Sequence, residues 1–179
     1  MKNITKVFLS LLLVGIVLSG CEEAEELLDV KFDANYDTEI DVTITPGTKS
    51  VNGVFNVTET IDPNSDSQFA EYASKIKGID ISEVTTEILY INPNVTLVST
   101  NLSIFNDKSS VTWTFTNEEL SVGTVLTLDN NAGQWNTVED ILMDKSVFTV
   151  TINGETVEDN AEFIILIKLK SEVTASPLD

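Results

Sequence analysis

The sequence predicts a mainly β protein: an antiparallel β-sandwich, immunoglobulin-like or jelly-roll-like, with one or two short helices. Three observations lead to this prediction. Apolar and polar residues alternate over long stretches, turn residues recur between those stretches, and helical spacing of apolar residues is confined to two short segments. Alternation with a period of two is typical of half-buried strands, and evenly spaced turns between short strands are typical of sandwiches and barrels.

The first strand pattern begins at Val30. Apolar or small residues occupy the even positions as far as Ile44, and polar residues occupy most of the odd positions. This predicts a half-buried strand, or a bent pair of strands, whose even-numbered side chains face the core. Pro46-Gly47 predicts a turn, and the segment 51–61 then continues the alternation as a second strand.

Helical spacing first appears between Phe69 and Ile76. It predicts a helix from about Asp66 to Lys77, in which Ser65 and Gln68 have the spacing of a capping box. A second, shorter helix is predicted near residue 136, because Asn136 and Glu139 also have the spacing of an N-cap and its third helical residue.

The rest of the chain predicts strands. Ile79 and Ile81 are at odd positions, whereas the apolar residues from Val84 to Tyr90 are at even ones. A bulge near Ser82-Glu83 is therefore needed if all these side chains are to lie on the same face of the strand. Further strands are predicted at 95–99, 102–105, 111–115, 122–128, 147–152 and 161–173. An Asn153-Gly154 turn is predicted before the last of them. Within that last strand the run 163–167 is apolar on both faces, which predicts a central strand covered on both sides, and residues 174–179 are expected to form a loose tail.

Composition excludes several kinds of catalytic site. The chain of 179 residues has no histidine, no arginine and one cysteine. Ser-His-Asp and Cys-His catalysis and histidine-ligated zinc sites therefore lack the residues they need, and we expect no enzyme. A glycoside hydrolase requires only two carboxylates, so a carboxylate-based glycan hydrolase remains a third hypothesis.

The N-terminal segment has the features of a signal peptide spanning residues 1–20. Lys2 and Lys6 precede an apolar run, Val7 to Leu18, that is shorter than the roughly 20 residues a membrane-spanning helix needs. The run ends in Leu18-Ser19-Gly20-Cys21, which resembles the lipobox of bacterial lipoproteins. This resemblance implies cleavage between Gly20 and Cys21 and lipid attachment to Cys21, which then anchors the protein to a membrane. The alternative is an ordinary secretory signal followed by a spare thiol.

An acidic tether, residues 21–28, follows the cleavage site. Its four glutamates resemble the export signal of surface lipoproteins of the Bacteroidota type: Glu22, Glu23, Glu25 and Glu26. The resemblance implies a lipid-anchored protein of the outer membrane, displayed at the cell surface. A lipoprotein facing the periplasm is the alternative. Residues 29–179 are then expected to form a single domain.

The charge restricts the partners. All 29 acidic residues follow position 20, whereas Lys2 and Lys6 precede it, so the remaining eight lysines leave a net charge of −21 on the mature chain. Such a chain repels nucleic acid, which we exclude as a partner. The charge is compatible with a glycan, a basic protein or cations as partners, besides the membrane that the lipid on Cys21 would enter.

One segment has the spacing of calcium ligands. Asp62, Asn64 and Asp66 offer oxygen atoms at the intervals that open a calcium loop. Ser67 and Ala73 stand where such a loop needs its glycine and its bidentate glutamate. The segment therefore favours a turn and helix cap, with at most weak Ca²⁺ binding. A second loop with oxygen-bearing side chains, at 129–131, is no stronger a candidate for cation binding. No other cofactor is expected.

The two tryptophans lie in different contexts. Trp113 alternates with apolar neighbours and is expected in the core, whereas Trp135 lies in a polar segment. An exposed indole there would stack on a sugar ring, and the alternative is that it packs against the sheet. The sequence thus favours a non-enzymatic envelope lipoprotein with a binding, accessory or structural role, and a carbohydrate-binding module of a glycan uptake system is the alternative.

Overall fold

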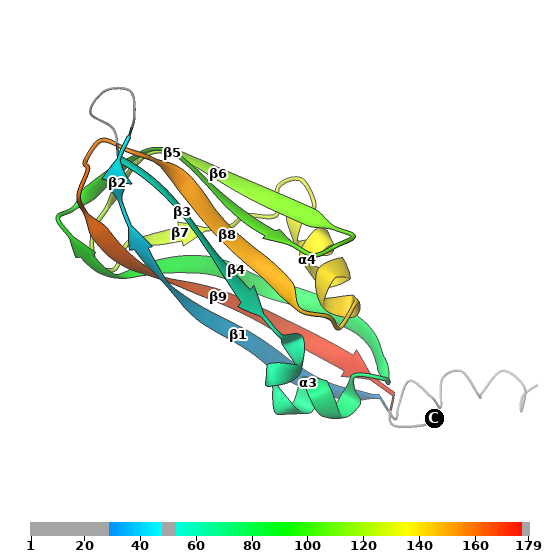
Figure 1. Ribbon diagram of the computed structural model, residues 1–179. Helices are drawn as coiled ribbons and strands as arrows, with labels where there is room; N and C mark the ends of the chain where they lie inside the picture. Colours follow the sequence, from blue (N-terminus) through cyan, green and yellow to red (C-terminus); the bar gives the residue numbers. More distant parts are fainter. Residues whose placement is uncertain (1–28, 48–52, 177–179) are drawn as a thin grey trace, which may run out of the picture.

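The computed structural model describes residues 29–47 and 53–176. These residues form two antiparallel sheets packed face to face, with two short α-helices at their margins (Figure 1). The predicted antiparallel β-sandwich is confirmed. No helix within the described residues is long and apolar enough to cross a membrane.

The strands are long, and several run the length of the molecule (Figure 1). Their bounds are β1 (Val30–Thr43), β2 (Thr45–Pro46), β3 (Gly53–Ile61), β4 (Ile76–Asn92), β5 (Val95–Phe105), β6 (Ser110–Leu120), β7 (Val125–Thr127), β8 (Phe148–Thr156) and β9 (Glu162–Ala175). The helical elements are a 3₁₀ turn (Pro63–Ser65), α3 (Ser67–Tyr72) and α4 (Gln134–Met143).

The strand order identifies the sandwich as a jelly roll. One sheet has the order β1-β9-β4-β7 and the other β2-β3-β8-β5-β6. Apart from the two-residue β2, eight strands fill two sheets of four, and the first and last strands of the roll are neighbours. This arrangement is the double-sheet solution that jelly rolls use. Of the two sandwich types that the sequence left open, the jelly roll is therefore the correct one.

The first and last strands pair along their whole length. β1 and β9 are in unbroken register from Val30 opposite Ala175 to Thr43 opposite Glu162. The even residues of β1 face the core as the alternation predicts, with Ile40 fully buried. β9 is central, between β1 and β4, as predicted. Its outer face is less covered than expected, because Ile164 is only half-buried.

β4 contains the predicted bulge. The pairing of β4 with β9 shifts between Ile81 and Glu83, which brings both Ile81 and Val84 to the core side. An extra residue in one strand changes which face the following side chains occupy. The sequence prediction of a change in parity at Ser82-Glu83 is confirmed.

The first helix is shorter than predicted and has a different cap. α3 ends at Tyr72, not at Lys77, because Ile76 already pairs with Ala175 of β9 and is buried. The predicted Ser65–Gln68 capping box is wrong. Asp66 is the N-cap, and its carboxylate accepts hydrogen bonds from the N–H groups of Gln68 and Phe69, both at 2.9 Å.

The second helix begins three residues earlier than the predicted N-cap at Asn136 implies. α4 starts at Gln134, after Gly133, whose φ of 78° lies in the left-handed region that glycine tolerates. Asn136 is therefore not an N-cap. The carboxylate of Glu139 instead accepts a hydrogen bond from the backbone N–H of Ile81, at 3.1 Å, and so ties the helix to β4.

Three strand predictions also need correction. Residues 95–105 form one strand rather than two, residues 122–124 precede β7 rather than belong to it, and Asn153-Gly154 lies inside β8 instead of forming a turn. β8 has a partner on each side, since Gly154 pairs with Phe55 of β3 and with Thr100 of β5. Of the predicted loose tail, residues 174–175 belong to β9, and 177–179 lie outside the described residues.

A buried tyrosine links the two sheets to α3. The ring of Tyr36 makes edge-on contacts with Phe69 of α3 and Phe148 of β8, with ring centroids 6.3 and 6.4 Å apart. Its hydroxyl donates to the carbonyl oxygen of Pro63 at 3.2 Å. Burial raises the pKa of the Tyr36 phenol above its ordinary value, so the group remains a hydrogen-bond donor.

The close packing at Gly154 generates a first prediction. A Cβ added there would lie 2.6 Å from the Ser99 carbonyl oxygen and 2.9 Å from Thr100 Cα, both of them backbone atoms. Gly154→Ala should therefore lower the free energy of unfolding by about 2 kcal/mol, as overpacked cores do. Urea unfolding followed by tryptophan fluorescence measures this change.

Gly78→Ala is the matched control for this substitution. Gly78 also lies in a strand, and a Cβ there meets nothing within 4 Å. The unfolding midpoint of the Gly78→Ala variant should stay close to that of the unmodified protein. Equal destabilisation by both substitutions would contradict the packing explanation.

Candidate functional site

The candidate site lies on the outer face of the four-stranded sheet. Because side chains alternate along each strand, the outward residues of β1, β9 and β4 form rows across the sheet. One row contains Asp41, Ile164 and Tyr90, which are register partners on the three strands. In the next row Thr43 stands opposite Glu162. Both rows lie near the end of β1 that is remote from Val30.

A bulge brings the aromatic ring to this face. The pairing of β4 with β9 shifts between Ile88 and Tyr90, so that Leu89 is an extra residue. Ile88 and Ile91 are buried, whereas Leu89 and Tyr90 are 37% and 41% exposed. The sequence pattern placed Tyr90 on the same face as Ile88, and that prediction is wrong. Without this shift the phenol would point into the core.

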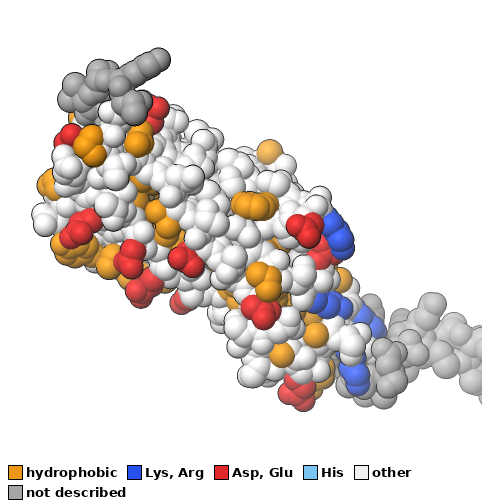
Figure 2. Space-filling model, viewed as in Figure 1, with side chains coloured by type: hydrophobic (Ala, Val, Ile, Leu, Met, Phe, Trp, Pro, Cys, Tyr) orange, Lys and Arg blue, Asp and Glu red, His pale blue; other side chains and the backbone are white. Residues whose placement is uncertain are grey.

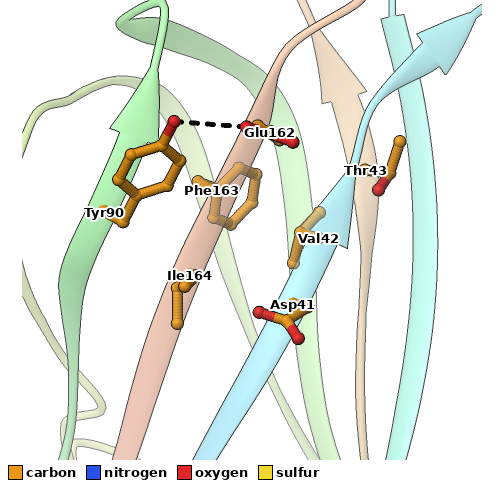
Figure 3. A pocket seen from close by; sticks show the side chains of 7 residues that line it. All are labelled: Asp41, Val42, Thr43, Tyr90, Glu162, Phe163 and Ile164. Atoms are coloured by element: carbon orange, nitrogen blue, oxygen red, sulfur yellow. Dashed lines mark hydrogen bonds between the residues drawn. The ribbon is translucent and has the colours of Figure 1, made fainter.

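The row forms a recess of about 180 Å³. Figure 3 shows Tyr90, Ile164 and Asp41 side by side on neighbouring strands, with the Tyr90 hydroxyl directed at Glu162. That hydroxyl donates to Glu162 Oε1 at 3.2 Å. The residues that line the recess are Asp41, Val42, Thr43, Tyr90, Glu162, Phe163 and Ile164.

Apolar side chains continue from the recess across the sheet. Leu166 is half-buried and stands between Glu39 of β1 and Glu87 of β4, and Val125 of β7 is 55% exposed beside Glu87. Ile164 and Leu166 form a short apolar strip along β9 that carboxylates border, and Glu87 separates this strip from Val125. A strip of this kind suits a ligand that has both an apolar face and polar edges.

The other half of this face is a ladder of ion pairs. Lys168 of β9 lies 2.6 Å from Glu87, and Lys170 lies 2.7 Å from Glu83. The hydrogen bond from Lys170 lowers the pKa of the Glu83 carboxyl, and the hydrogen bond to Glu87 raises the pKa of Lys168. Because these lysines are already paired with β4, they do not neutralise the carboxylates of the recess.

The recess thus combines an aromatic ring with unneutralised acids. Neither Asp41 nor Glu162 belongs to any ion pair within 4 Å among the described residues. A carboxylate accepts hydrogen bonds and attracts cations, and it repels anions. The recess therefore suits a neutral ligand with hydroxyl groups or a cationic ligand, and it disfavours phosphate and other anions.

Trp135 is not part of this recess. Its side chain is partly buried against the hydrophobic core, and its indole N–H donates to the Leu128 carbonyl oxygen at 2.8 Å. Its backbone N–H donates to the side chain of Asn130, also at 2.8 Å. These contacts favour packing against the sheet over stacking on a sugar. Trp113 is buried, as expected.

The predicted cation ligands act as caps. Asp62 accepts hydrogen bonds from the backbone N–H and the side-chain amide of Asn64, at 2.9 and 3.0 Å, while Asp66 caps α3. Within the part of the chain that the structure describes, no group of three or more acidic side chains is arranged to hold a metal ion. The turn-and-cap interpretation accounts for these contacts, and weak calcium binding by the loop stays a prediction.

The predicted anchor and export residues lie outside the described residues. These are Gly20, Cys21, Glu22, Glu23, Glu25 and Glu26. The described chain starts at Asp29, whose carboxylate forms an ion pair of 3.1 Å with Lys77 at the beginning of β4. The described chain therefore begins at the end of the sandwich where β1 begins and β9 ends (Figure 1).

Sequence reasoning missed the recess, although one signal pointed to it. The run from Phe163 to Ile167 is apolar on both faces, and the interpretation given above was that protein covers both. The same pattern is also typical of a strand that has one face in the core and the other in contact with a ligand. Asp41, Tyr90 and Glu162 come from three strands far apart in the sequence, so no local motif joins them.

Comparisons with known proteins assign no family. No family model matches the chain, and no curated protein matches it. A crystal structure of the decameric BFDV capsid protein resembles the chain with a TM-score of 0.41 and 7% identity, over 81% of this chain and 99% of that one. A Desmodium yellow mottle tymovirus structure has a TM-score of 0.30 and 8% identity, over 84% of this chain and 91% of that one.

The capping role of Asp66 generates a second prediction. Asp66→Ala should lower the free energy of unfolding by about 1 kcal/mol, since two N–H groups at the start of α3 lose their acceptor. If Asp66 acts only as a cap, the loss should be the same in calcium and in chelator, whereas weak calcium binding by the loop predicts a larger loss in calcium. Thermal unfolding under both conditions, at matched ionic strength, measures it.

The Asp66→Asn variant distinguishes a capping role of residue 66 from a role in binding a cation. Asparagine is as good an N-cap as aspartate but carries no charge, so this variant should retain most of the stability. A calcium-dependent stabilisation that Asp66→Asn abolishes would contradict the cap as the main role of this residue.

Proposed function

We propose that the protein is a non-enzymatic envelope lipoprotein, held in the outer membrane by lipid on Cys21 and displayed at the cell surface, whose jelly roll binds a ligand. The segment Leu18-Ser19-Gly20-Cys21 and the acidic run after it support the anchored location. Each buried methylene of an acyl chain contributes about 0.8 kcal/mol, so several chains hold a soluble domain at a bilayer.

One observation supports the binding role above all others: the exposed ring of Tyr90 in a recess bordered by Asp41 and Glu162. The recess lies near the end of β1 that is opposite the tether. In an anchored protein it would face away from the membrane. A single anchor at Cys21, nine positions before Val30, leaves this face accessible.

A glycan is the ligand class that the recess favours, which makes a carbohydrate-binding module of a glycan uptake system the second candidate function. The face of a tyrosine ring packs against the apolar face of a sugar, and carboxylates accept hydrogen bonds from its hydroxyl groups. Tyr90 would supply the ring, and Asp41 and Glu162 would supply the acceptors. Lectins are among the proteins built on jelly rolls, but this is an analogy of fold alone.

The anchor generates a third prediction. Cys21→Ala should abolish incorporation of labelled fatty acid and move the protein from the membrane pellet to the soluble fraction, because the thiol that carries the lipid is gone. Metabolic labelling followed by fractionation of the producing bacterium measures both effects. A variant that still sediments, beside an unmodified protein that takes up no label, would contradict the lipoprotein proposal.

A variant with alanine at the four glutamates of the tether is the matched control. It keeps Cys21 and should stay in the membrane fraction, but external protease on intact cells should no longer reach it. Equal digestion of both proteins would mean that the acidic run is only a spacer. Protection of the unmodified protein would favour the periplasm-facing alternative.

The recess generates a fourth prediction. Tyr90→Ala should lower the affinity for a bound neutral oligosaccharide by about tenfold, since burial of about 60 Å² of ring surface contributes about 1.5 kcal/mol. A glycan array identifies the oligosaccharide, and calorimetry with the full chain in detergent gives the affinities. Absence of binding to any glycan would remove this candidate function.

Val147→Ala is the control for the Tyr90 variant. Val147 is also a large exposed apolar residue, at 54%, and it precedes β8 rather than lining the recess. The Val147→Ala variant should bind the oligosaccharide with the affinity of the unmodified protein. Equal losses in both variants would argue against the recess as the binding site.

A further inference from the structure

β1 is a long edge strand, and its unpaired side borders a separate recess at residues 35–38 whose other wall is formed by Thr60, Ile61, Asp62 and Ser65. It has 14 residues and stands at the end of the order β1-β9-β4-β7. Among the described residues β9 is its only pairing partner in the sheet. An edge strand of this length presents a row of main-chain donors and acceptors on which a further strand can pair.

The hydrogen-bond pattern shows which residues present those groups. The N–H of Ile44 donates to the carbonyl oxygen of Ala161 at 2.8 Å, and the Ala34 carbonyl oxygen accepts from the hydroxyl of Ser171 at 2.9 Å. Even-numbered residues of β1 therefore direct their main-chain groups toward β9. Since the register is unbroken, the odd-numbered residues direct theirs toward the open side.

Four of the seven odd-numbered residues of β1 are acidic and exposed, and the other three are Lys31, Asn35 and Thr43. Asp33, Asp37, Glu39 and Asp41 lie on the outer face at intervals of two or four residues. None of them belongs to an ion pair within 4 Å among the described residues. Figure 2 shows lysines gathered near the end where β1 begins, whereas acidic side chains predominate toward the other end.

This charge pattern selects between occupants of the edge. In a second copy of the chain, an antiparallel β1 would bring carboxylates opposite carboxylates, and like charges directly across a strand pair destabilise it. A strand with lysine or arginine at alternate positions would place cations beside Asp33, Asp37, Glu39 and Asp41. The open edge supplies the main-chain bonds, and the outward acids supply the preference for a basic partner.

We propose that the open edge of β1 accepts an extended basic segment of a partner protein as a fifth strand of this sheet. Strand addition of this kind draws affinity from main-chain hydrogen bonds and specificity from alternate side chains. The inference goes beyond the proposed function, because it needs neither the lipid on Cys21 nor the ring of Tyr90.

The probe is a fluorescent nine-residue peptide with lysine at every second position and threonine between, matching the span from Asp33 to Asp41. Two further peptides serve as comparisons: one has the same composition with the lysines grouped together, and one has N-methyl groups on the backbone nitrogens that would face β1. Anisotropy with the full chain in nonionic detergent gives the affinities. We expect the alternating peptide to bind at least about tenfold more tightly than either comparison.

Charge reversal on the protein gives a second, independent measurement. Asp33→Lys with Glu39→Lys should weaken binding of the lysine peptide by about tenfold and should bring its affinity closer to that of the corresponding glutamate peptide, which Asp37 and Asp41 still repel. Neither residue lines the recess. The matched control, Glu71→Lys with Asp107→Lys, makes the same change in net charge at exposed sites outside β1 and should leave both affinities as they are.

Two results would overturn the proposal. Equal binding of all three lysine peptides would mean that only general electrostatic attraction is present, and no binding of the alternating peptide would mean that the edge accepts no basic strand. Tyr90→Ala should leave peptide binding unchanged. Loss of glycan binding and loss of peptide binding are therefore distinguishable failures.

Discussion

The structure depends on the alternation of side chains along three adjacent strands, β1, β9 and β4. Because the period is two, a slip of one residue would expose the whole inward set. β1 and β9 keep one register over 14 residues, whereas β4 has 17 residues against the same strand. The three extra residues are absorbed at three register shifts, all in β4. The core remains continuous because the irregularity is confined to one strand.

Part of the fold could be predicted from the sequence, and part of it depends on contacts between distant segments. The alternation in β1 and the central position of β9 follow from the pattern of apolar residues, and so does the shift after Ile81. The end of α3 does not, because Ile76 joins β4 only through its pairing with Ala175, about 100 positions away in the chain. Likewise Asn153-Gly154 has the composition of a turn but is held straight by strands on both sides. In each case tertiary pairing overrode a local preference.

The candidate site was less predictable than the fold, for a related reason. The bulge at Leu89 leaves no distinct mark in the sequence, yet it alone turns Tyr90 outward. Of the residues that sequence reasoning selected as possible cation ligands, Asp62 and Asp66 have local hydrogen-bonding roles as caps. Short polar side chains near turns compete for backbone N–H groups, so the spacing of ligands is also the spacing of caps.

The unbroken pairing of β1 with β9 also has a mechanical consequence. In the proposed anchored protein, tension from the membrane would enter β1 at Val30, and a load bound in the recess would pull on β9 and β4 through Glu162 and Tyr90. The force then passes from β1 to β9 in a direction parallel to the strands, so the hydrogen bonds of the ladder are loaded together in shear instead of being opened one after another. A strand attached this way resists pulling far better than one peeled from its end.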